Sequence, residues 1–166
     1  MIVSLEVNGQ ARQIEAPPET LLIEALRASL FEGGLGLTGA HVGCDTSQCG
    51  ACTVRLNGAA VKACTVLIGQ AEGAKIVTIE GIGAPGALHP MQAAFQDNHA
   101  LQCGFCTPGM IMAAIDLVEA GGAMDEASVR EGLSGNLCRC TGYHNIVRAV
   151  LDAAERMGAA RTEKAA

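Results

Sequence analysis

Residues 44–52 read Cys-Asp-Thr-Ser-Gln-Cys-Gly-Ala-Cys and place three thiols on one short loop. Thiolates gathered this closely are strongly anionic, so a loop that holds them must direct backbone N–H groups at sulfur, as anion-binding nests do. Glycine suits such a loop because it reaches positive φ without steric cost and lets the backbone approach closely. Gly43 and Gly50 supply it here, and we expect the loop to enclose an inorganic centre.

A fourth thiol, Cys64, lies further along the chain. The spacing C-x4-C-x2-C with a more distant cysteine is the plant-type ferredoxin arrangement, in which four thiolates hold a two-iron, two-sulfide (2Fe–2S) cluster. Zinc is the alternative, because C-x2-C pairs also occur in structural zinc sites. A third thiol in the same loop and an offset fourth favour the larger two-iron core. The predicted ligands, called the first thiol group, are Cys44, Cys49, Cys52 and Cys64.

Four more cysteines form a second thiol group, Cys103, Cys106, Cys138 and Cys140. Their C-x2-C and C-x-C pairs could serve zinc or a second 2Fe–2S cluster, so the spacing alone leaves this metal open. No histidine stands at the spacing of a Rieske centre. Two inorganic centres suit a chain of 166 residues, because small domains often need a metal to supplement a limited core.

The composition is that of a globular protein, with 49% hydrophobic but only 2% aromatic residues. A net charge of −6 without a basic patch argues against a nucleic-acid partner. The N-terminus lacks the pattern of a signal peptide, and no apolar run is long enough to span a bilayer. We therefore expect a cytoplasmic protein whose cysteines are metal ligands and not disulfides. No motif of a catalytic triad or of a phosphate-binding loop is present.

The first half of the chain has the pattern of a small sheet. Apolar residues alternate over residues 2–7, as in a half-buried strand, and Asn8-Gly9 and Asn57-Gly58 predict the turns of two hairpins. Helical spacing over residues 20–30 predicts one helix on that sheet. We expect an α+β domain formed by residues 1–80.

The second half has a helical pattern. Glycine and proline crowd residues 81–90, which predicts a linker. Residues 91–157 contain four segments of helical periodicity, so we expect a four-helix domain with its cysteines at helix ends. Thr107-Pro108 predicts a helix start, with threonine as N-cap and proline in the first helical position. Residues 158–166 are small and charged, and are expected to form a mobile tail.

Longer runs surround both thiol groups: Thr38–Cys44, Cys49–Thr53, Gln102–Gly109 and Gly135–Tyr143. With these runs, the chain from about Val3 to Met157 resembles the small iron–sulfur subunit of molybdenum hydroxylases, the family of xanthine oxidase and aerobic carbon monoxide dehydrogenase. The resemblance implies a β-grasp, ferredoxin-like N-terminal domain. It also implies a C-terminal four-helix bundle in which the second thiol group holds its own 2Fe–2S cluster.

The resemblance also implies partners: a large subunit that carries molybdopterin and a medium subunit that carries FAD, in a dimer of heterotrimers. Gln102 and Cys140 would contact the molybdopterin. Electrons from the molybdenum site would pass through the second cluster and then the first to FAD. The chain would thus be the non-catalytic electron-transfer subunit of an oxidoreductase. Carbon monoxide, an aldehyde or an N-heterocycle remain candidate substrates of the complex.

On the residues alone, two other hypotheses about the function stay open. A free-standing two-cluster ferredoxin would need the same cysteines but no partner subunits. A zinc-binding interaction module would be colourless.

His41, three residues before Cys44, could hydrogen-bond the first loop, and a structural role is expected for it. Arg139, between two cysteines of the second group, either offsets negative charge or faces solvent.

Overall fold

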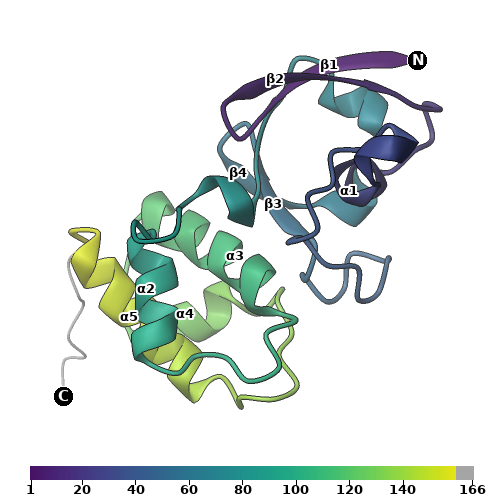
Figure 1. Ribbon diagram of the computed structural model, residues 1–166. Coiled ribbons are helices and arrows are strands. Elements are labelled where there is room, and N and C mark those ends of the chain that lie inside the picture. Colours follow the sequence, from purple (N-terminus) through teal and green to yellow (C-terminus); the bar gives the residue numbers. More distant parts are fainter. Residues whose placement is uncertain (160–166) are drawn as a thin grey trace.

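The computed structural model describes residues 1–159, in which a sheet lobe is followed by a helical lobe (Figure 1). The sheet lobe comprises β1 (Ile2–Val7), β2 (Gln10–Glu15), α1 (Leu22–Arg27), β3 (Thr53–Leu56), β4 (Ala59–Lys62) and β5 (Lys75–Val77). The helical lobe comprises α2 (Pro90–Asp97), α3 (Thr107–Ala120), α4 (Glu126–Gly132) and α5 (His144–Arg156). From residue 160 on, the expected tail lies outside the described residues. Within residues 1–159, no helix is long and apolar enough to cross a membrane.

The sheet has five strands in the order β2-β1-β5-β3-β4, with β1 and β5 parallel and the other neighbours antiparallel. Both predicted hairpins are present. Their Asn-Gly turns have positive φ at both residues, 51° and 76° in Asn8-Gly9 and 51° and 89° in Asn57-Gly58, as a type I′ turn requires. α1 buries its apolar residues in the core of the sheet lobe. This α+β lobe has the predicted β-grasp architecture.

α1 is shorter than predicted. Its N-cap position is Leu21, whose backbone N–H donates to the Glu24 carboxylate at 2.8 Å, and the helix stops at Ala28, where the backbone is extended. A separate 3-10 turn follows, closed by hydrogen bonds between Ser29 and Glu32. Leu30, the last residue of the helix predicted over residues 20–30, therefore lies outside α1, and 74% of its surface is exposed.

The helical lobe has its own apolar core. α3 is buried on most sides, and its methionines Met110 and Met112 are core residues. Asp125 caps α4, since its carboxylate accepts from the Ser128 backbone N–H at 2.8 Å. The start of α3 differs by one residue: Cys106 is the N-cap, and Thr107 is already helical. The four helices thus form the bundle that the sequence predicted.

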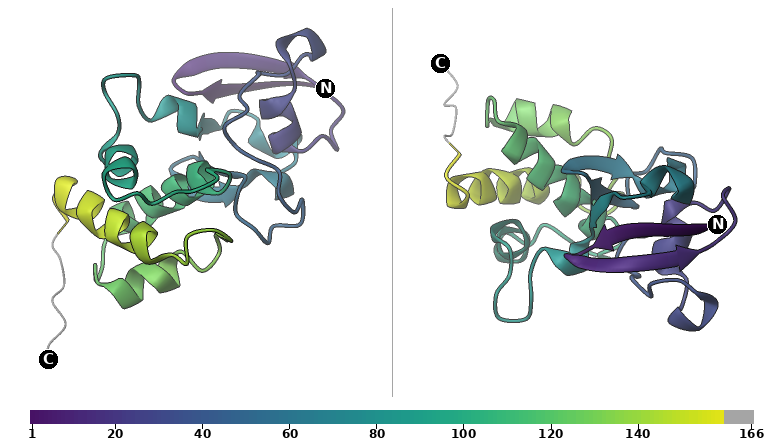
Figure 2. Two further views of the ribbon diagram at one scale, coloured as in Figure 1. Left: turned by 60° about the horizontal axis from the view of Figure 1, so that its bottom comes forward. Right: turned by 90° about the horizontal axis from the view of Figure 1, so that it is seen from above.

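α3 is also the element that joins the two lobes, because it lies against β3 and β4 (Figures 1 and 2). The Asp116 carboxylate on α3 accepts from the Ala60 backbone N–H at 3.1 Å, and Glu119 forms an ion pair with Arg55 of β3. Gly109, in the first turn of α3, approaches the loop of the first thiol group closely: a Cβ built there would lie 2.2 Å from the Gly50 carbonyl oxygen. This packing brings the two thiol groups to the same junction.

Candidate metal centres

The loop of the first thiol group directs backbone amides at sulfur, as predicted. Four N–H groups donate at 3.3–3.4 Å: those of Thr46, Gln48 and Cys49 to Cys44 Sγ, and that of Ser47 to Cys64 Sγ. Positive φ at Asp45, Ser47 and Gly50 curls the chain around the thiols. Successive amides that point inward make an anion-binding concavity. The loop is therefore built for negatively charged sulfur.

The thiols of this group differ in their proton affinity. Hydrogen bonds from the backbone of Thr46 and Cys49 lower the pKa of Cys44 to about 6. Burial raises the pKa of Cys52 to about 11, and the adjacent Cys64 thiol contributes to that shift. A buried thiol with a raised pKa loses its proton when a metal binds, because the metal supplies the compensating charge. The donor set, with the lowered pKa of Cys44 and the two buried thiols of Cys52 and Cys64, fits a metal–sulfur centre.

The second thiol group is arranged as two pairs. Cys103 Sγ and Cys140 Sγ lie 3.5 Å apart, and both residues are exposed. The thiols of Cys106 and Cys138 hydrogen-bond each other further inside. Burial, with a contribution from Cys138, raises the pKa of Cys106 to about 12. Two sulfur pairs match the four thiolate ligands of a 2Fe–2S cluster, in which each iron takes two of them.

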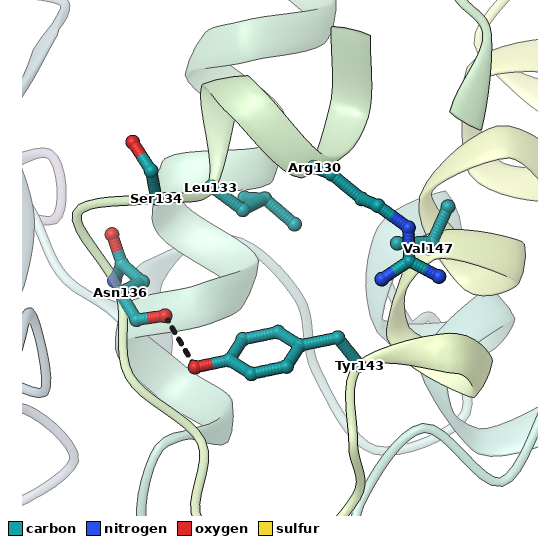
Figure 3. A pocket seen from close by; sticks show the side chains of 6 residues that line it. All are labelled: Arg130, Leu133, Ser134, Asn136, Tyr143 and Val147. Atoms are coloured by element: carbon teal, nitrogen blue, oxygen red, sulfur yellow. Dashed lines mark hydrogen bonds between the residues drawn. The ribbon is translucent and has the colours of Figure 1, made fainter. Parts of the chain in front are cut away.

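Cys138 is held by its neighbours in the run that follows it. Burial raises its pKa, but hydrogen bonds from the Thr141 hydroxyl and from the backbone of Cys140 and Thr141 outweigh that effect and lower it. Its own backbone N–H donates to the Tyr143 hydroxyl at 2.8 Å. Figure 3 shows the Tyr143 ring across a pocket of about 180 Å³, its hydroxyl directed at the backbone oxygen of Asn136. The tyrosine thus fixes the loop of the second thiol group.

The two thiol groups are fastened to each other directly. The Leu137 backbone N–H donates to the Cys49 carbonyl oxygen at 2.8 Å. The buried Asn136 amide donates to the Gly50 carbonyl oxygen at 3.0 Å and to Thr53 Oγ1 at 3.3 Å. Leu137 precedes a cysteine of the second group, and Cys49 belongs to the first. One peptide hydrogen bond therefore links the two candidate centres.

His41 and Phe105 make a second link between the loops. The rings stack with centroids 4.6 Å apart, and His41 Nδ1 lies 2.7 Å from the Phe105 carbonyl oxygen. The structural role predicted for His41 is present, although its side chain bonds the second loop and not the first. Phe105 and Asn136 were not predicted as site residues, since nothing in the local sequence indicates partners more than sixty positions away.

Other predicted site residues lie at the surface. Gln102, Arg139 and Cys140 are exposed. His89 caps α2, since its ring nitrogen accepts from the Met91 backbone N–H at 3.1 Å. Within residues 1–159, no three His, Cys, Asp or Glu side chains are grouped as ligands of a single metal ion.

Comparisons with known proteins define the class. A family model described as a 2Fe-2S iron-sulfur cluster binding domain matches residues 5–75, and one described as a [2Fe-2S] binding domain matches residues 78–151. The chain therefore contains two 2Fe–2S binding domains. It belongs to the family of small iron–sulfur subunits of molybdenum hydroxylases, which are non-catalytic electron-transfer subunits of oxidoreductases.

Individual relatives cover almost the whole chain. The nicotine 6-hydroxylase small subunit of Paenarthrobacter nicotinovorans is 46% identical over 94% of this chain and 91% of its own length. The caffeine dehydrogenase subunit gamma of Pseudomonas sp. (strain CBB1) is 43% identical over 98% and 96%.

Solved structures agree with the fold. A chain of quinoline 2-oxidoreductase from Pseudomonas putida 86 superimposes with a TM-score of 0.87 and 41% identity, covering 96% of this chain and 98% of that one. The aldehyde oxidoreductase of Desulfovibrio desulfuricans also gives 0.87, with 45% identity, and here the match spans only 17% of the longer chain.

Proposed function

We propose that this chain is the electron-transfer subunit of a molybdopterin-containing hydroxylase or dehydrogenase. The two thiol groups would each hold one 2Fe–2S cluster. When bound, the clusters supply one-electron transfer between the molybdopterin of a large subunit and the FAD of a medium subunit. The observation that carries the proposal is the hydrogen bond from Leu137 N–H to the Cys49 carbonyl, because it joins the loops of the two thiol groups directly.

The exposure of the thiols supports the placement of the second thiol group toward a partner subunit. Cys103 and Cys140 are exposed, so the second thiol group can face the large subunit. Three apolar residues that stand within two positions of a cysteine of this group in the sequence, Leu101, Phe105 and Leu137, are each more than 40% exposed. A partner subunit that covered the second thiol group would bury them. In the proposed path, the second thiol group receives electrons from the large subunit and the first group passes them on.

We assign residues 1–80 to the first cluster-binding domain. The predicted linker 81–90 ends one residue earlier than expected, because Pro90 already begins α2 of the second domain, which extends to residue 157. Two separate apolar cores support this division: one gathers β1, α1 and β5, and the other gathers α2 to α5. Because each domain is small and has its own limited core, we expect metal binding to contribute to the free energy of folding.

The substrate of the complex is proposed to be an N-heterocycle. Relatives named for nicotine, caffeine and nicotinate support this class, and relatives named for aldehydes make an aldehyde the second candidate. This chain would not contact the substrate, so its own residues do not distinguish an N-heterocycle from an aldehyde. A cytoplasmic dimer of heterotrimers is the proposed assembly.

Purification of the native complex tests the function. We expect two larger chains to co-purify, with about four moles each of iron and acid-labile sulfide per small chain. After reduction with dithionite, two distinct 2Fe–2S signals should appear in the EPR spectrum. A chain that purified alone with both signals would be a free-standing ferredoxin. A colourless chain that contained zinc would contradict the cluster assignment itself.

Replacement of Gln102 by alanine tests the proposed contact with the molybdopterin. We expect both EPR signals to persist, while substrate reduces the clusters about tenfold more slowly, the equivalent of one lost hydrogen bond. The measurement is stopped-flow absorbance after mixing with substrate. The matched control is Gln48→Ala, because Gln48 is also exposed and also precedes a cysteine of its group. Equal rates for wild type and Gln102→Ala would remove the proposed contact.

A further inference from the structure

The Thr141 side chain touches a sulfur atom of the second thiol group. Thr141 Oγ1 lies 3.1 Å from Cys138 Sγ, and it also accepts a hydrogen bond from the Tyr143 backbone N–H at 3.1 Å. A hydroxyl has one proton and two lone pairs. Because a metal-bound cysteine is a thiolate without a proton, the proton of this contact must come from Thr141. With the amide on one lone pair, the hydroxyl is oriented to donate to sulfur.

The orientation is fixed by the surrounding loop. Gly142 has a φ of 65°, and this left-handed backbone turns the Tyr143 N–H that follows it back toward Thr141. The Tyr143 hydroxyl in turn accepts from the Cys138 backbone N–H, so that amide is not directed at the sulfur. Figure 3 shows the same hydroxyl beside the Asn136 backbone oxygen. Thr141, Tyr143 and Cys138 thus form a closed set of hydrogen bonds around one ligand sulfur.

Donors to sulfur are present in both thiol groups. Around Cys44 and Cys64, four backbone amides donate at 3.3–3.4 Å, and the Thr46 side chain also contributes at Cys44. Around Cys138, backbone groups of Cys140 and Thr141 also contribute, but one donor is a side-chain hydroxyl. This donor can be removed without changing the backbone.

We propose that Thr141 is a positioning residue that raises the reduction potential of the second cluster by donating an O–H···S hydrogen bond to Cys138. This rests on the proposed function, in which Cys138 is a cluster ligand. Reduction adds one electron and therefore negative charge, which spreads onto the ligand sulfurs. A donor at sulfur stabilises the reduced state more than the oxidised state. The hydroxyl thereby makes the second cluster a better acceptor for electrons from a partner.

The test is an EPR-monitored redox titration of the purified complex carrying Thr141→Val or Thr141→Ser. Valine keeps the shape of threonine without the hydroxyl, and serine keeps the hydroxyl. We expect valine to lower the midpoint potential of one signal by about 59 mV, a tenfold change in a one-electron equilibrium. Serine should keep the wild-type value, and the other signal should not move. The control is Thr65→Val, which removes a hydroxyl beside Cys64 that donates to the Lys62 carbonyl oxygen.

Each outcome separates this inference from the proposed function. Wild-type complex without two 2Fe–2S signals would end the proposed function itself. Two signals in the valine variant with an unchanged potential would end only the role of Thr141. Equal shifts in the valine and serine variants would also contradict it, because the hydroxyl would not be the cause. Loss of the cluster with valine but not with serine would assign Thr141 to the folding of the loop.

Discussion

Replacement of Cys49 by serine is expected to remove one of the two clusters and to destabilise the sheet lobe. Cys49 supplies a thiol to the first group, and its backbone N–H and carbonyl oxygen both bond neighbouring parts of the junction. Without the cluster, the buried thiols of Cys52 and Cys64 lose the iron that would compensate the charge of their thiolates. Since metal-binding free energy is also folding free energy, the apparent melting temperature should fall with the loss of iron.

The measurement is the iron and acid-labile sulfide content together with the EPR spectrum. Iron should fall from about four to about two moles per chain, and one signal should disappear. The reciprocal variant Cys140→Ser is the control. Cys140 is exposed and belongs to the second group, so the other signal should disappear while the sheet lobe keeps its stability. Two full signals in Cys49→Ser would show that its thiol is not a ligand.

Much of the fold could be predicted because its signals are local. Alternation over β1 and the two Asn-Gly turns fix strands and hairpins through residues that touch each other. The end of α1 was missed, although Ser29 and Glu32 stand at the spacing of a capping box. That local motif starts a separate 3-10 turn, so Leu30 lies in this turn and not in α1. Helical periodicity alone does not show where a competing cap interrupts it.

The membership of each thiol group could also be read from spacing, whereas the junction between the groups could not. The nest was expected from Gly43 and Gly50, yet the structure uses positive φ at Asp45 and Ser47 as well. Gly43 serves close approach, since a Cβ there would lie 2.9 Å from Cys49 Sγ. The bond from Asn136 to Gly50 spans 86 positions. Such contacts depend on how α3 packs on the sheet, which no local pattern encodes.

Replacement of Gly109 by alanine is expected to destabilise the protein, although helix propensity alone favours alanine over glycine in α3. The new Cβ would lie 2.2 Å from the Gly50 carbonyl oxygen and 3.1 Å from two backbone atoms of Ala51. These are main-chain atoms of the loop that holds the first thiol group, so no flexible side chain can move aside. Overpacking of this kind costs about 1–3 kcal/mol, and the gap between the lobes must widen to relieve it.

The measurement is the free energy of unfolding of the cluster-loaded complex, with the spin–spin splitting between its two reduced clusters as a second readout. The matched control is Gly135→Ala at the same junction, where a Cβ would meet only the flexible end of Lys62, 3.4 Å away. We expect the control to keep both the stability and the splitting, and Gly109→Ala to lose part of each. If alanine at 109 were as stable as wild type, with the same splitting, α3 would not be the element that sets the distance between the two centres. Helix propensity predicts that alanine at position 109 raises the free energy of unfolding, whereas the contact with the Gly50 carbonyl oxygen predicts that it lowers it. The sign of the measured change therefore shows which effect dominates at this position.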